Sequence, residues 1–220
     1  MVAVHVNHEE YNYMTNNDAQ CRICRSCGKK LMLKGERCNT PKCAMVTRNY
    51  IPGIHGAKRR GKQSQYGMQL SEKQRVKFSY GLREKQFKLL FEKAKKQGNA
   101  GEILLQMLET RLDNVIFRLG LAVSRAQARQ MVGHSNFLIN GQTVNIPSYQ
   151  VQTGDIITVK NNKAKNKLFK EAMERAKKAE LPGWLNWNLT DLEAKVLHQP
   201  GKDEVDQLAN IQAIVEFYSR

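Results

Sequence analysis

Five cysteines lie between positions 21 and 43 of the chain. The pairs Cys21-x2-Cys24 and Cys38-x4-Cys43 are separated by 13 residues, a spacing that lets two short loops present four thiolates to one tetrahedral metal ion. The residues before them carry Glu9, Glu10 and Asp18 and no Arg, unlike a secretion signal, so crowded thiols favour a metal over disulfides. The sequence therefore predicts a metal site made by Cys21, Cys24, Cys38 and Cys43.

The type of ligand leaves the identity of the metal open. Four thiolates suit zinc, which we expect, and they suit an iron–sulfur cluster of four irons equally well. Cys27 extends the first pair to a Cys-x2-Cys-x2-Cys run. That run is compatible with a cluster, and it is equally compatible with Cys27 being a spare thiol.

Positive charge is the second feature with chemical consequences. The 220 residues include 36 Lys and Arg against 20 Asp and Glu, which gives a formal net charge of +16. Residues 21–96 hold 21 of these bases and only 4 acids, and residues 161–180 hold 7 bases and 3 acids. Such clustering indicates a surface for nucleic acid, because solubility alone does not require it.

No motif of catalysis is found in the sequence. Residues 56–63 resemble a phosphate-binding loop, but Gln63 stands where a magnesium-binding Ser or Thr is needed. Pro52-Gly53, just before, does not suit the buried strand that such a loop follows. We therefore expect that the protein is not an enzyme and interpret the basic run Lys58-Arg59-Arg60, with Lys62, as a loop that faces RNA.

Helices and a small sheet are expected to position these groups. A capping box of Ser71 and Gln74 predicts a helix to about residue 80, and apolar spacing predicts further helices over 83–97, 102–119, 124–132 and 163–181. The Asn140-Gly141 turn predicts a hairpin over 137–144. Residues 1–20 are expected to be a flexible extension, residues 156–159 a strand, and residues 211–218 a final strand and turn.

Two pairs of arginines are expected to share helix edges. Arg111 and Arg118 are seven residues apart on the helix predicted over 102–119. Arg125 and Arg129 are four residues apart on the next helix. Together they predict a compact platform for phosphate groups.

Many short motifs, in order, resemble the bacterial-type small-subunit ribosomal protein S4 family, from about Cys21 to the last residue. The longer ones are Leu33-Lys-Gly-Glu-Arg-Cys38, Pro41-Lys-Cys-Ala-Met45, Leu108-Glu-x-Arg-Leu-Asp-Asn-Val115, Ala122-Val-Ser-Arg125 and Glu216-Phe-Tyr-Ser-Arg220. The four paired cysteines also keep the spacing of metal-bearing members.

The resemblance implies an α+β protein of two domains. Residues 21–101, completed by 161–220, would form a mostly helical domain with a metal-clipped N-terminal segment. Residues 102–160 would form an inserted RNA-binding module of two helices and a small antiparallel sheet. The residues expected to contact RNA are Arg48, His55, Lys58, Arg59, Arg60, Lys62, Lys73, Arg83, Arg111, Arg118, Ser124, Arg125, Arg129, Gln130 and His134.

The resemblance also implies a function and partners. Such a protein would bind small-subunit (16S-type) rRNA at a multi-helix junction in the 5′ domain and nucleate assembly of the subunit body. It would contact ribosomal protein S5, contribute to decoding accuracy and lie near the mRNA entry path in the cytoplasm. No membrane span and no small-molecule substrate are expected. A metal-dependent nucleic-acid-binding regulator is the alternative that the cysteines and the charge also permit.

Overall fold

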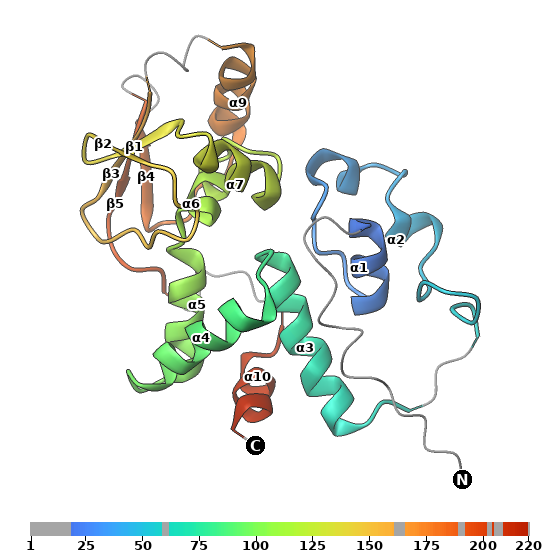
Figure 1. The fold of residues 1–220 in the computed structure, drawn as a ribbon. Helices are drawn as coiled ribbons and strands as arrows, with labels where there is room; N and C mark the ends of the chain where they lie inside the picture. Colours follow the sequence, from blue (N-terminus) through green and yellow to red (C-terminus); the bar gives the residue numbers. More distant parts are fainter. Residues whose placement is uncertain are drawn as a thin grey trace.

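The computed structural model describes residues 19–58, 62–160, 166–188, 192–201, 204 and 209–219 (Figure 1). They form a mixed α+β fold, which confirms the expected fold class at that level. The helices are α1 (Gln20–Cys27), α2 (Ala44–Thr47), α3 (Gln65–Ser79), α4 (Glu84–Lys95), α5 (Ala100–Glu109), α6 (Leu112–Arg118), α7 (Arg125–Gly133), α9 (Lys167–Lys178) and α10 (Ile211–Tyr218), with a 3-10 turn η1 (Gly35–Asn39). The strands are β1 (Phe137–Ile139), β2 (Gln142–Val144), β3 (Ile156–Val159), β4 (Leu185–Asn188) and β5 (Glu193–Val196).

Helices α3, α4, α5 and α10 share one apolar core, and we call them the first helical group. Phe87 of α4, Leu104 and Leu108 of α5, and Ile214 of α10 are fully buried in it. Figure 1 shows α10, from the end of the chain, lying beside α3. The last residues of the protein thus complete a core that begins before residue 80.

The prediction of a strand and turn at 211–218 is wrong, because these residues form helix α10. The side chain of Asn210 caps the helix by accepting a hydrogen bond from the backbone N–H of Ala213. Ile211, Ile214 and Val215 are spaced three and four residues apart, which places them on one face against the core. The apolar run was misread because its helical period spans only two turns.

Two other helix boundaries also differ from the predictions. Helix α3 begins at Gln65 and is capped by Ser64, so Ser71 lies inside the helix rather than at its start. The helix predicted over 102–119 is two helices, because the chain bends between Thr110 and Leu112. There the N–H of Val151 donates to the carbonyl of Thr110, and the N–H of Leu112 donates to the carbonyl of Tyr149.

The second unit is built on an antiparallel sheet, and we call it the sheet unit. Among the described residues its strands follow the order β2-β1-β3-β5-β4. The predicted hairpin is confirmed, since Asn140 and Gly141 have φ of 50° and 80° between β1 and β2, as a type I′ turn requires. Helices α6, α7 and α9 share its core, in which Trp184 is fully buried.

Residues 161–220 are expected to complete the first domain, but in the structure their described parts are divided between the two units. Helix α9 and strands β4 and β5 belong to the sheet unit, while α10 belongs to the first helical group. Phe169, Ala172 and Ala176 give the basic helix α9 an apolar face, which must be buried on a core. Helix α5, expected in the module over 102–160, packs in the first helical group.

The N-terminal segment, with α1, η1 and α2, packs on both units. Ile23, Cys27 and Leu31 form a small cluster with Phe78 of α3. Gly35, at φ 58°, fits so closely beside Val123 that an added Cβ would lie 2.3 Å from the Val123 carbonyl oxygen. The segment thus contacts the loop between α6 and α7. Across the described part of the chain, no helix is long and apolar enough to span a membrane.

Candidate nucleic-acid interface

The carboxylate of Glu109 lies fully buried where α5 ends and the two units meet. Arg118 donates to both carboxylate oxygens, over 3.0 Å from Nε and 2.7 Å from Nη2. The Tyr80 hydroxyl donates to Oε1 over 2.6 Å, and Asn114 Nδ2 donates to Oε2 over 2.7 Å. We call Tyr80, Glu109, Asn114 and Arg118 the Glu109 cluster. It joins α3 of the first helical group to α6 of the sheet unit.

Charge in this cluster is set by the arginine. Burial alone would raise the pKa of Glu109, but the hydrogen bonds and charge of Arg118, together with the Tyr80 hydroxyl, hold it below its ordinary value. Glu109 is therefore ionised at neutral pH. Burial, with the negative charge of Glu109, raises the pKa of Tyr80, so its hydroxyl stays a donor.

A second buried carboxylate, Asp113, is held by two other arginines. Arg111 donates to both of its oxygens over 3.2 Å. Arg129 donates to Asp113 Oδ2 over 2.7 Å from Nη2 and 3.0 Å from Nε. Arg129 also donates to the backbone carbonyls of Tyr80 and Gly81, so α7 is tied to the end of α3.

Arg125 lies between two aromatic rings. Its guanidinium carbon is 4.6 Å from the ring centres of both Tyr80 and Phe117. Its Nε donates to Asn114 Oδ1 over 2.7 Å. This combination of stacking and hydrogen bonding holds the side chain in a fixed position.

The four arginines expected to form a phosphate platform thus bind protein groups in this structure. The break between α5 and α6 also means that Arg111 and Arg118 do not share one helix edge: Arg111 precedes α6, and Arg118 is its last residue. The predicted helix start at Ser124 is confirmed, with its hydroxyl accepting from Gln127 N–H. Ser124 is buried and acts as a cap.

Lys73, another expected RNA contact, is 4% exposed. Its Nζ lies 2.6 Å from Glu84 Oε1, and the other oxygen of Glu84 accepts from Lys77. Burial lowers the pKa of Lys73, and Glu84 partly opposes that effect. Tyr218 of α10 also donates to Glu84, so this group fastens the end of the chain.

The remaining expected contacts lie on the surface, apart from Arg59 and Arg60, which fall outside the described residues. The exposed ones are Arg48, His55, Lys58, Lys62, Arg83, Gln130 and His134. Further exposed lysines of the N-terminal segment, such as Lys30 and Lys42, belong to the same basic stretch of sequence.

Sequence reasoning missed the carboxylates that receive the buried arginines. Glu109 and Asp113 directly follow Leu108 and Leu112 in a stretch where apolar residues recur at helical spacing, and an acid so placed is the signal which could have identified them. A charged residue in such a place is buried only when it is paired. Tyr80 carried no comparable signal, because its partner Glu109 lies 29 residues away along the chain, and the link of Glu84 to Tyr218 spans 134 residues.

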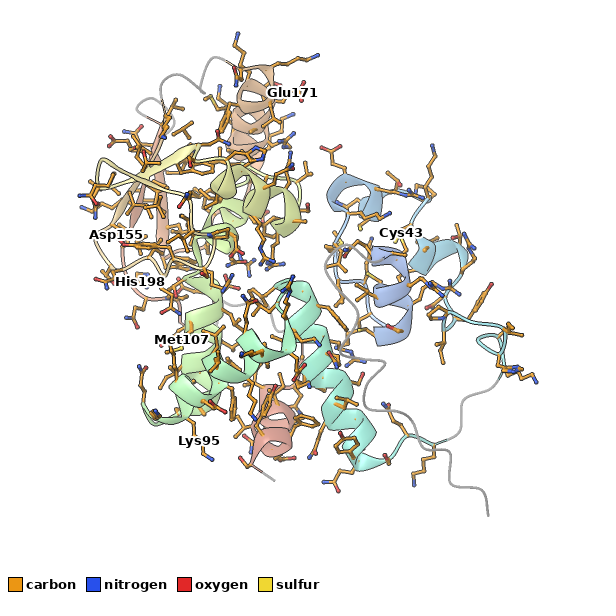
Figure 2. The ribbon with its side chains drawn as sticks, in the orientation of Figure 1. Cys43, Lys95, Met107, Asp155, Glu171 and His198 are labelled. Carbon is orange, nitrogen blue, oxygen red and sulfur yellow. The ribbon has the colours of Figure 1, made fainter. Side chains whose placement is uncertain are left out.

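The four cysteines predicted as ligands line a single cavity of about 10 Å³. Burial raises the pKa of the Cys24 thiol, and the nearby Cys38, Cys21 and Cys43 raise it further. Figure 2 shows Cys43 on the N-terminal segment, well apart from Asp155 and His198 beside the sheet. Among the described residues, however, no group of three or more His, Cys, Asp or Glu is arranged to hold a metal ion, so the metal prediction is not confirmed.

Two family models match consecutive parts of the chain. The ribosomal protein S4/S9 N-terminal domain matches residues 15–109, and the S4 domain matches residues 110–157. The boundary between them falls at the bend that separates α5 from α6. The Glu109 cluster therefore lies on this boundary.

Curated relatives match nearly the whole chain. A small ribosomal subunit protein uS4 of Halothermothrix orenii is 53% identical over 201 residues, which cover 91% of this chain and 96% of the relative. Proteins of the same name from Pelotomaculum thermopropionicum and Gloeobacter violaceus are 50% and 49% identical, with the same coverage.

Proposed function

Because the chain belongs to the uS4 family of small ribosomal subunit proteins, we propose that it is a structural, non-enzymatic component of the small subunit, located in the cytoplasm, that binds the rRNA of that subunit. The observation that carries the proposal is the identity of about half of all residues over 91% of the chain. The net charge of +16 supports it, because phosphate neutralisation drives binding to RNA.

The finer role that we propose is early binding at a multi-helix junction in the 5′ domain of the rRNA, where the protein nucleates assembly of the subunit body. Contacts with ribosomal protein S5 and with mRNA near the entry path, and an influence on decoding accuracy, belong to the same proposal. Two folded units joined by buried charges support it. A rigid protein surface recognises the shape of a folded RNA without having to be ordered on binding.

The expected RNA contacts divide into two groups by their surroundings. We propose that the exposed residues, among them Arg48, Lys58 and Lys62, contact phosphates. Arg111, Arg118 and Lys73 instead maintain the shape of the surface, because their charges are already paired inside the protein. Removal of an exposed cation should therefore change the salt dependence of binding, and removal of a buried one should change stability.

The combined variant Arg48→Ala, Lys58→Ala, Lys62→Ala tests this division. We expect weaker binding to an rRNA junction fragment and a log–log salt slope that is shallower by about 2–3, since each lost phosphate contact contributes roughly 0.7–0.9. The control, Lys195→Ala, removes an exposed lysine of β5 that lies outside both basic stretches of the sequence. Filter binding between 50 and 400 mM salt measures both, and equal slopes for the two variants would contradict the assignment.

We also propose that Cys21, Cys24, Cys38 and Cys43 bind one zinc ion. The type of donor fits, because all four cysteines line one small cavity and zinc is commonly held by four thiolates. When bound, the ion would tie the two ends of the N-terminal segment together.

Anaerobic purification followed by quantification of zinc, iron and sulfide tests the zinc proposal. We expect one zinc per chain, loss of the metal in Cys38→Ser and its retention in the control Cys27→Ser, because Cys27, unlike the four proposed ligands, does not line the cavity. Protein with about four irons, or with no metal, would overturn the proposal and leave the RNA proposal intact.

A further inference from the structure

A cavity of about 270 Å³ lies where three separate parts of the chain meet. Its walls are residues 31–33 of the N-terminal segment, residues 78–81 at the end of α3, and the first turns of α7. It adjoins the groups that tie α7 to α3, since Arg125 and Arg129 both line it. The cavity thus exists only when the N-terminal segment, the first helical group and the sheet unit are assembled.

The lining combines an apolar floor with polar donors. Leu31, Phe78 and Tyr80 are buried apolar or aromatic side chains. Arg129 and Gln130 supply guanidinium and amide groups on the α7 side. No Asp or Glu is among the described residues that line the cavity. Such a lining suits a flat, apolar ring system whose edges accept hydrogen bonds and which carries negative charge nearby.

Two further observations concern the rim. Arg129 Nη1 carries two N–H groups, and its bond to the Gly81 carbonyl, 2.7 Å long, uses one of them. Met32 has φ of 55°, in the left-handed region that a side chain rarely adopts, and it remains 38% exposed. Backbone strain of this kind persists where surrounding structure imposes it, and it is frequent at ligand-binding sites. Met32 is also one of the residues that line the cavity, so its flexible thioether can report on a ligand there.

We infer that this cavity accepts one unpaired rRNA nucleotide turned out of its helix, an inference that rests on the proposed function. The base lies on the floor formed by Leu31, Phe78 and Tyr80, and its edge accepts hydrogen bonds from Arg129 and Gln130. The volume, slightly below the roughly 300–1,000 Å³ of sites for drug-sized ligands, suits a single base. Unstacked bases in loops and junctions are the parts of RNA that proteins read individually.

Filling the cavity tests the inference. Ala126 is exposed and lines the cavity, so Ala126→Trp blocks the site without touching the buried arginine pairs. We expect about tenfold weaker binding to an rRNA junction fragment, because the contribution of one stacked base to the affinity is lost. The log–log salt slope should stay unchanged, because no phosphate contact is removed. Ala126→Leu should give a smaller loss. The control is Gln142→Trp, on an exposed position of β2 in the sheet unit.

A second readout uses the S-methyl NMR resonance of Met32 in the full-length protein. AMP, GMP, CMP and UMP are titrated separately, with inorganic phosphate as the probe for simple anion binding. We expect at least one nucleotide to shift this resonance saturably, phosphate to leave it in place, and the shift to vanish in Ala126→Trp.

The outcomes separate this inference from the proposed function. A wild-type protein that fails to bind the junction fragment overturns both. Normal wild-type binding with equal affinity for Ala126→Trp, or no shift of Met32 with any nucleotide, overturns the cavity inference alone. Equal RNA affinity combined with loss of binding to ribosomal protein S5 would assign the cavity to a protein partner instead.

Discussion

A chain that ends at Asn210 is expected to leave the first helical group without a stable fold while the sheet unit stays folded. Helix α10 supplies Ile214, which is fully buried in the core, and Ile211 packs so closely on α5 that a Cβ on Gly101 would lie 2.8 Å from it. Losing one such apolar side chain costs about 2–5 kcal/mol. Several are lost together, which is comparable with the 5–15 kcal/mol that stabilises a typical domain.

The truncation also removes polar partners from α3 and α4. Glu216 accepts a hydrogen bond from Gln69 over 2.8 Å, and Tyr218 donates to Glu84 over 3.0 Å. Glu84 pairs with Lys73, whose Nζ also lies 4.6 Å from the ring centre of Phe217. Without α10, Lys73 would lose the rings of Phe217 and Tyr218, which help to shield its ion pair with Glu84 from water.

Hydrogen exchange followed by mass spectrometry measures this prediction region by region. We expect α3, α4 and α5 to exchange rapidly in the truncated chain, while β1, β3 and the buried part of α7 stay protected. The control chain ends at Tyr218 and keeps all of α10. If α3 and α4 exchanged as slowly in the chain that ends at Asn210 as in the control chain, α10 would not be required for their folding.

Because the first helical group depends on α10, the order in which the two units can fold during synthesis is restricted. The first helical group begins before residue 80 but lacks part of its core until residue 214 and its neighbours have been made. The sheet unit, in contrast, contains its strands and helices between residues 112 and 196. Folding of the two units is therefore expected to finish in the reverse of their order of synthesis, and an incomplete chain would not present the assembled surface to RNA.

Local features of the sequence were predicted well, and features that depend on distant residues were not. The Asn140-Gly141 turn and the Ser124 cap were predicted correctly because each is fixed by its own neighbours. Helix α10 is wrongly predicted as a strand and turn, because the core on which its apolar face packs is supplied by residues more than 100 positions earlier. The bend at Thr110 depends on backbone hydrogen bonds with residues 149–151, which the sequence around Thr110 does not predict.

The candidate site shows the same limit. The arginines at 111, 118, 125 and 129 are expected to offer their charges to phosphate groups, whereas in the structure each of them hydrogen-bonds to a protein group. Their hydrogen-bond partners were not foreseen, because composition gives the sign of a charge and not the residue that neutralises it. Tyr80 and Glu109 are 29 residues apart in the chain, and only the fold brings the Tyr80 hydroxyl within 2.6 Å of the Glu109 carboxylate.

Replacing Glu109 is the second change with a large expected effect. In Glu109→Ala the guanidinium of Arg118, 16% exposed, loses both of its carboxylate bonds and becomes a nearly buried charge without that partner. Removing one member of a buried pair costs roughly 3–5 kcal/mol of the free energy of unfolding. Glu92→Gln is the control, because its pair with Lys88 is exposed and such pairs contribute about 0–1 kcal/mol. Urea unfolding at pH 7 measures both.

The pH dependence distinguishes a lost charge from lost packing. The pKa of Glu109 is depressed in the folded protein, so its ionised form contributes stability above the ordinary pKa of about 4.3, and that contribution is lost as the pH falls through the lower, folded value. Glu109→Gln keeps the shape of the side chain but has no proton to gain. Its deficit relative to wild type should therefore be largest at neutral pH and shrink on acidification below pH 4. A deficit that stays constant between pH 7 and pH 3 would show that Glu109 contributes through packing, and the charge of the Glu109 cluster would then have no part in holding the two units together.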